Sequence, residues 1–295
     1  MTKSHAKLID DTQTIARMPG WVTSSRHETP EDVAFLSGAA LATLQAALSR
    51  SEVPHALLRD RMALRAAQTC VGFSGRGEGT GDLRDAVHLT RPGDLPGPAG
   101  ETYALWRRAV ERPLSPAGLR RALPGVEATR LADWLDAGGG GGPVARAAQV
   151  LGRVLDDAPR EGDTALILAE ATLARALGWD HLLPLITPSV SRADLRKRGD
   201  DLRRACHRAM IATATETIPL AADLSRRAAH LRRVAPKLRA KGAGPAVEMF
   251  LTRDAVAPAA LPLPDRAARR LCDRLVDLGA VRELTGRDSF RLYGL

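Results

Sequence analysis

Hydrophobic residues recur every three to four positions along most of this chain, the spacing that places them on one face of an α-helix. Residues 29–32 are typical of a helix start: Thr29 can cap the helix, Pro30 suits its first turn, and the two acidic residues that follow favour its positive end. The pattern predicts helices over about 30–50, 54–72, 82–89, 101–112, 126–137, 143–157, 163–178 and 179–186, with one more opening at Ser115.

The pattern changes after a boundary at residues 187–189. A long helical stretch is predicted from Ser191 to about Ala240, and Pro219 and Pro236 are expected to kink or break it. Three short helices and one β-hairpin are predicted after it, over residues 246–253, 256–261, 264–279 and 281–293. Three short helices followed by a hairpin are the outline of a winged helix-turn-helix.

The sequence therefore predicts a mostly α protein, with an N-terminal helical bundle, a long basic helical segment and a C-terminal winged helix-turn-helix that carries one β-hairpin. We place a flexible N-terminus at residues 1–28, the bundle at 29–187, the basic segment at 188–243 and the winged-helix module at 244–295. Composition agrees with this class, because aromatic residues make up only 3% of the 295 residues and alanine is abundant.

Cellular location and metal content follow from what the sequence lacks. It has no apolar run of 18 or more residues, and its first residues have no apolar core of a secretory signal, so we expect a cytoplasmic protein with no membrane partner. Cys70, Cys206 and Cys272 are far apart and odd in number. That spacing predicts reduced thiols, with no disulfide framework and no metal site.

Basic residues are concentrated in the last third of the chain. The net charge is +9, from 43 basic and 34 acidic residues. From Pro188 onward 22 basic residues face 12 acidic ones, and Leu224–Val247 carries seven basic residues and no acidic one. A segregated basic block is typical of a surface that binds a polyanion. The alternative is an arginine-rich helix that is merely solvated.

The third short helix of the predicted module is the candidate recognition helix. Its apolar positions share one face, and arginines occupy the other face of its N-terminal half, where a helix that reads the major groove contacts bases. Four aspartates, at 265, 273, 277 and 288, dilute this basic face. The candidate DNA-binding residues are Arg266, Arg269, Arg270 and Arg274 in the helix, Arg287 and Arg291 in the hairpin, and Arg232, Arg233, Lys237 and Arg239 in the basic segment.

Several stretches resemble an uncharacterised α-proteobacterial family, domain of unknown function 1403. They are FLSGAALATL (35–44), LRDAVHLTRPGDLPGPAG (83–100), APKLRAKGAG (235–244), DAVAPAAL (254–261) and the most specific block, DRAARRLCDRLVDLGAVRELTGRDSFRLYGL (265–295). The resemblance covers nearly the whole chain after residue 19, with Pro264 in place of an expected Ser. The family has no established activity, so the resemblance implies no function.

A shorter stretch suggests a different relationship. Residues Ser74–Gly79 read S-x-x-x-E-G, which resembles the inhibitory helix motif of Fic-type AMP-transferases. In that family the glutamate of the motif, which Glu78 matches here, blocks ATP binding. Fic catalysis needs a His-Pro-Phe motif and a Gly-Asn-Gly cradle. None of the seven histidines here precedes a proline, and the cradle is missing. The resemblance therefore implies at most a degenerate relative, or a coincidence of six residues.

Other polar residues suggest no definite chemistry. His181 adjoins Asp180, His88 follows Asp85, and His207 adjoins Cys206, but no third group stands at a diagnostic spacing. The sequence contains no P-loop, zinc helix or cysteine-nucleophile signature. We therefore predict no catalytic, cofactor-binding or metal-binding residue and favour a non-enzymatic role.

Three functions follow from these patterns. The first is binding of double-stranded DNA through the winged helix, as a regulator or a replicon-associated factor. The second is a scaffold whose winged helix binds a protein partner or a second copy of the chain. The third is a degenerate Fic-like enzyme, which a pocket joining His88, Asp85, Glu78 and an arginine would favour.

Overall fold

The computed structural model describes residues 17–24, 29–91, 93–238 and 242–295. These residues are mostly helical, as the sequence predicts, and form one small two-stranded antiparallel sheet near the C-terminus. The helices are α1 (Gly20–Ser24), α2 (Pro30–Leu48), α3 (His55–Phe73), α4 (Thr80–His88), α5 (Gly97–Glu111), α6 (Pro116–Ala122), α7 (Ala128–Asp136), α8 (Pro143–Asp157), α9 (Gly162–Ala176), α10 (Gly199–Val234), α11 (Ala243–Thr252) and α12 (Asp265–Asp277).

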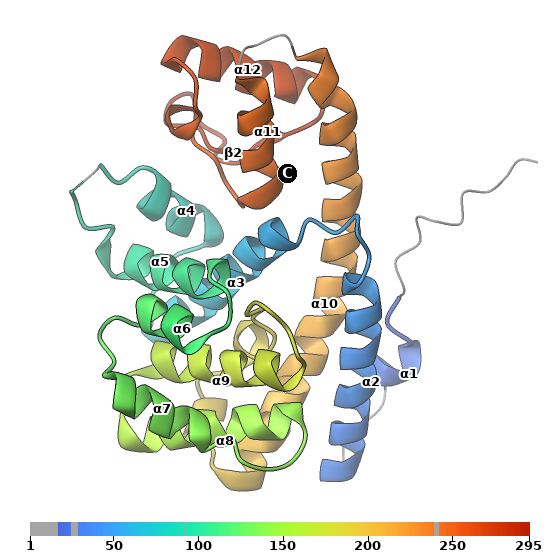
Figure 1. Ribbon diagram of the computed structural model, residues 1–295, viewed down its shortest axis with the longest axis vertical. Helices are drawn as coiled ribbons and strands as arrows, with labels where there is room; N and C mark the ends of the chain where they lie inside the picture. Colours follow the sequence, from blue (N-terminus) through green and yellow to red (C-terminus); the bar gives the residue numbers. More distant parts are fainter. Residues whose placement is uncertain (1–16, 25–28, 92, 239–241) are drawn as a thin grey trace, which may run out of the picture.

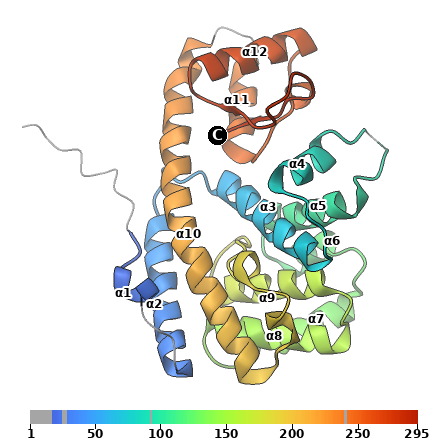
Figure 2. The same cartoon turned by 180° about the vertical axis from the view of Figure 1, so that it is seen from behind.

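The 36-residue helix α10 runs along one side of the molecule and connects its two ends (Figure 1). Its N-terminal part packs against α8, α2 lies alongside it, and its C-terminal part reaches α11 and α12. Pro219 lies inside α10 without ending it, and the helix bends about midway along its length (Figure 2). A proline removes one backbone hydrogen bond, and the packing on both halves keeps the helix continuous.

The rest of the bundle stacks in pairs beside α10. The buried helix α9 packs against α8, and α3 packs against α5, with α4 beside both. Thr29 caps α2 by accepting the main-chain N–H of Asp32, as the sequence predicts. Buried side chains form a core that continues from Val22 to the last residues. In the stretch predicted to be a flexible start, α1 buries Val22 against this core.

The C-terminal module, residues 243–295, lies at the end of the molecule that α10 reaches (Figures 1 and 2). Between α11 and α12 the chain makes a single 3-10 turn, η5 (Pro258–Ala260), where the sequence predicted a helix. The predicted hairpin is present but short, with β1 (Arg282–Glu283) antiparallel to β2 (Tyr293–Gly294). Tyr293 also exchanges two main-chain hydrogen bonds with Val256, at 2.8 and 2.9 Å.

Two further predicted helical stretches are wrong. Residues 179–186 are not helical, and α10 begins at Gly199 rather than near Ser191. The reason for the first lies in Glu170 of α9, which is fully buried and accepts the main-chain N–H groups of Leu185, Ile186 and Thr187 at 2.8–2.9 Å. These N–H groups are therefore not available to a helix, and Pro184 within the segment has no N–H and disfavours helical geometry at the residue before it.

The three cysteines are buried free thiols. In the part of the chain that the structure describes, no helix is long and apolar enough to cross a membrane.

The Glu170 cradle predicts a large loss of stability on truncation. Glu170→Ala leaves three buried N–H groups without an acceptor, and each costs about 1–3 kcal/mol. We expect the midpoint of urea unfolding to fall markedly. Glu161→Ala, in the loop before α9, is the matched control and should change it little. Equal effects of the two substitutions would contradict this role of Glu170.

Candidate nucleic-acid interface

A buried carboxylate holds the C-terminal module against the bundle. Asp254 follows α11 directly, and its side chain is inaccessible to solvent. Arg84 of α4 donates from Nε to Asp254 at 2.6 Å and from a terminal nitrogen at 3.2 Å, and Arg61 of α3 donates to the same carboxylate. Burial alone would raise the pKa of Asp254, but these two guanidinium groups lower it below its ordinary value.

A second acid completes this network. Asp60 of α3 accepts the main-chain N–H of Asp254 at 2.8 Å and the Nε of Arg107 from α5 at 3.0 Å. Burial raises the pKa of Asp60, and Arg107 offsets part of that rise. Two carboxylates and three arginines from α3, α4, α5 and the module thus pair in a place where an unpaired charge would be costly, and Arg107 also pairs with Glu111 at 3.3 Å.

Two further contacts join the module to the bundle. Arg287, in the loop between the strands, makes a two-pronged ion pair with Asp85 of α4, at 2.6 and 2.7 Å. The main-chain oxygen of Leu295 accepts Arg61 at 3.2 Å and Arg282 at 3.3 Å. Close backbone contact is also required, since a Cβ at Gly294 would lie 2.4 Å from the main-chain oxygen of Asp254.

Helix α12 buries one face and exposes a row of arginines on the other. Ala268, Leu271, Cys272 and Leu275 are buried. Arg266, Arg270 and Arg274 are exposed, and none has a carboxylate within ion-pair distance among the described residues. Arg269, on the flank, pairs with Asp265 one turn earlier at 3.1 Å. The exposed row lies at i, i+4 and i+8, so its positive charges share one side of the helix.

The end of α10 lies next to the end of α12. His230 of α10 donates from Nε2 to the main-chain oxygen of Leu278 at 3.0 Å. The basic residues around this contact, Arg232, Arg233 and Lys237, are exposed. Two basic segments about 40 residues apart in the sequence are thus combined at one end of the molecule (Figure 1). Arg239 lies outside the described residues.

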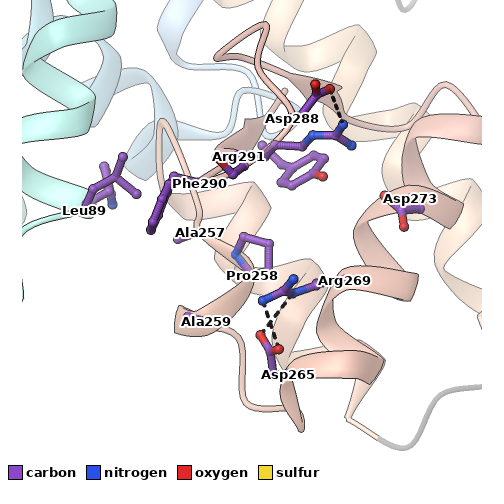
Figure 3. Close-up of a pocket in the computed structure, with 13 residues that line it drawn as sticks. Leu89, Ala257, Pro258, Ala259, Asp265, Arg269, Asp273, Asp288, Phe290 and Arg291 are labelled. Carbon is purple, nitrogen blue, oxygen red and sulfur yellow. Dashed lines mark hydrogen bonds and ion pairs between the residues drawn. The ribbon is translucent and has the colours of Figure 1, made fainter.

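The other flank of α12 faces a cavity of about 580 Å³ between the module and the end of α4 (Figure 3). Asp265, Arg269 and Asp273 line it from α12, with Arg291 and the exposed Phe290 opposite. Phe290 has a φ of 54° and is 73% exposed. The left-handed conformation of an exposed aromatic residue is a strained feature, which is common at functional sites.

His88 reaches the same cavity from α4. Burial, followed by the charge of Arg107, lowers its pKa to about 4, so the imidazole is neutral at pH 7. Its Nε2 is buried without a hydrogen-bond partner among the described residues. A neutral imidazole there offers one donor or acceptor to whatever enters the cavity.

The structure does not assemble the pocket that would favour a Fic-like enzyme. His88 lines the cavity just described, whereas Asp85 is held by Arg287 and Glu78 lies 3.9 Å from Arg76. Residues 74–79 form a loop before α4 rather than a helix. The described residues also contain no cluster of three or more histidine, cysteine, aspartate or glutamate side chains suited to a metal ion.

The candidate DNA-binding residues thus fall into two groups. Those of α12 and the end of α10 lie at one exposed end of the molecule, whereas Arg287 pairs with Asp85 of the bundle. Arg291 stays within the module, where it donates to the main-chain oxygen of Arg287 at 2.9 Å and pairs with Asp288 at 3.6 Å. Sequence reasoning missed Asp60, Arg61 and Asp254, because the charges that pair are almost 200 residues apart. In the sequence, these three charged residues differ from the others only in standing among apolar residues, which the structure shows to be buried.

Fold and site together define a mostly helical protein with a small C-terminal module docked through buried ion pairs and a basic surface beside it. The chain belongs to the family described as "Protein of unknown function (DUF1403)", whose model matches residues 6–295. Comparison with curated proteins found no match.

The Asp254 network predicts a specific pH dependence of stability. Asp254→Asn removes the charge that pairs Arg61 and Arg84, which should cost about 3–5 kcal/mol of unfolding free energy at pH 7. Because the folded-state pKa of Asp254 is lowered, its contribution is present above about pH 4 and is lost as the pH falls through the lowered pKa.

Urea unfolding of wild type and variant from pH 7 to pH 2.5 measures this. The two unfolding free energies should converge at the acidic end. Asp156→Asn, a substitution in an exposed ion pair with Arg198, is the matched control and should have little effect throughout. A difference between wild type and Asp254→Asn that persists unchanged to pH 2.5 would contradict the assignment.

Proposed function

We propose that the protein binds double-stranded DNA through the exposed face of α12 and the adjoining end of α10. The observation that carries this proposal is the row of Arg266, Arg270 and Arg274, three exposed guanidinium groups without carboxylate partners among the described residues. Successive members are about 6 Å apart along the helix axis. Such a row presents positive charge to a polyanion, and the exposed Asp273 and Asp277 on the same side of the helix offset part of that charge.

The layout of the module supports a winged helix-turn-helix, with α12 as the recognition helix. Two helices and a 3-10 turn precede a short antiparallel pair of strands, and Val256 adds a third extended segment beside Tyr293. An exposed helix at the end of a molecule fits the major groove. Arginines of its first turns can fork onto guanine O6 and N7, and the others can contact phosphates.

The remaining candidate residues have supporting roles in this proposal. Arg232, Arg233 and Lys237 would contact phosphates beside the groove, and Arg239, outside the described residues, stays a candidate from the sequence. Arg269 is available as well, because an exposed pair such as the one with Asp265 is weak. For Arg287, contact with DNA would compete with Asp85, so in this proposal Arg287 and Arg291 chiefly position the loop between the strands.

Phe290 favours a second candidate function. An aromatic side chain that is 73% exposed on a loop fixed by Arg287 is suited to contact a protein partner or a second copy of the chain. Phe290→Ser should abolish such an association without changing DNA binding. Sedimentation of the wild type and this variant separates the two functions.

Replacing one arginine of the row by a neutral residue should weaken DNA binding, because one positive charge is lost. For Arg270→Gln we expect an affinity loss of about 1–3 kcal/mol if it contacts a base, and a decrease of about one in the slope of log affinity against log salt if it contacts phosphate. Fluorescence anisotropy of the full chain with a random 20-base-pair duplex, at several salt concentrations, measures both quantities.

Arg153→Gln is the matched control, because Arg153 is exposed on α8 at the opposite end of the molecule. It should leave affinity and salt slope unchanged. Wild-type protein that does not bind duplex DNA at low salt, or equal losses in the two variants, would contradict the proposal.

A further inference from the structure

A second cavity, of about 420 Å³, lies between the start of α3 and the segment that follows α9. Its polar lining consists of Arg59 and His55 from α3 and Asp180 and His181 from the other segment. The ring of Trp179 also lines it, and the Nε1 of that ring donates to Gln45 at 2.6 Å. The volume falls within the range of small-molecule sites.

Arg59 differs from the buried arginines near it. Arg61, Arg84 and Arg107 each have an aspartate partner. Arg59 has no carboxylate within ion-pair distance among the described residues, and its Nε is buried without a hydrogen-bond partner. A largely buried guanidinium is costly unless an anion pairs with it.

The two histidines can donate hydrogen bonds to an anion that lies beside Arg59. Burial, followed by the charge of Arg59, lowers the pKa of both imidazoles, and each imidazole offers an N–H donor in its neutral and in its charged form. Asp180 is the acidic group in the lining, and it is exposed and adjoins His181. An oxyanion between Arg59, His55 and His181 would therefore meet three donors, with the exposed Asp180 as the acidic residue of the lining.

We infer that this cavity binds a small organic oxyanion, with Arg59, His55 and His181 holding its carboxylate or phosphate group and the ring of Trp179 and leucine side chains packing against its apolar body. Leu48, Leu58 and Leu183 supply this apolar wall. In this site the anionic headgroup pairs with Arg59, which has no carboxylate partner among the described residues. The site is separate from the DNA-binding surface proposed above.

Two probes with the same aromatic body distinguish the headgroups. Phenyl phosphate and benzoate are titrated into the full chain at pH 7 by calorimetry, with benzyl alcohol as the neutral probe. We expect at least one oxyanion to bind and benzyl alcohol not to bind. Arg59→Gln should weaken binding at least tenfold, whereas Arg153→Gln on α8 should not change it.

Imidazole proton resonances provide a readout on the unmodified protein. Binding of the oxyanion should shift the resonances of His55 and His181. The resonance of His207, which is hydrogen-bonded to Ser37 outside this cavity, should not change. If Arg59→Gln does not fold, His181→Gln tests the same contact. Wild type that binds neither oxyanion, equal binding of benzyl alcohol, or undiminished binding by a folded variant would overturn the inference.

Discussion

The arrangement of this protein depends on one buried carboxylate. Asp254 lies at the point where α11 ends, and the chain offers it two guanidinium groups from α3 and α4. Its main-chain N–H is taken by a second buried acid, Asp60. Paired in this way, the charges are tolerated in the interior, and they find these partners only when the module is docked on the bundle. The network therefore fixes where the module sits more than it adds to stability.

The docked position determines which surfaces remain available for function. Arg287 makes an ion pair with Asp85 of the bundle. Arg61 and Arg282 both donate to the main-chain oxygen of Leu295. Arg266, Arg270 and Arg274 of α12 are exposed, and His230 joins the basic end of α10 to Leu278, which follows α12 directly. Exposed arginines from two segments that are far apart in the sequence thus lie at one end of the molecule, with the exposed Asp273 and Asp277 among them, and these arginines are the basis of the proposed DNA binding.

The helical fold could be predicted well because its signals are local. Thr29 and Pro30 mark the start of α2, Pro143 lies in the first turn of α8, and the apolar spacing of α9 marks a buried helix. Errors arose where a distant group decides the local structure. The segment 179–186 is non-helical because Pro184 lacks an N–H and disfavours helical geometry at Leu183, and because Glu170 takes the N–H groups of Leu185 and Ile186. Pro184 is visible in the sequence, whereas the contact with Glu170 is not. The short hairpin was predictable from its turn and its alternation.

The site could be predicted only in part, for the same reason. Arginine spacing in α12 is visible in the sequence, so its exposed face was found. The pairing of Arg287 with Asp85 and of Asp254 with Arg61 joins residues far apart in the chain, and a charge pattern cannot tell a paired arginine from a free one. Arg59 illustrates the reverse case, since only the structure shows that it lacks an anion.

Amide hydrogen exchange of the full chain tests the central claim most directly, namely that the Asp254 network makes the module part of one body with the bundle. If this is so, the protected amides of α11 and α12 should exchange with the same opening free energy as those of α3 and α4. Exchange of α11 and α12 through a separate opening of much lower free energy, with α3 and α4 still protected, would contradict the account.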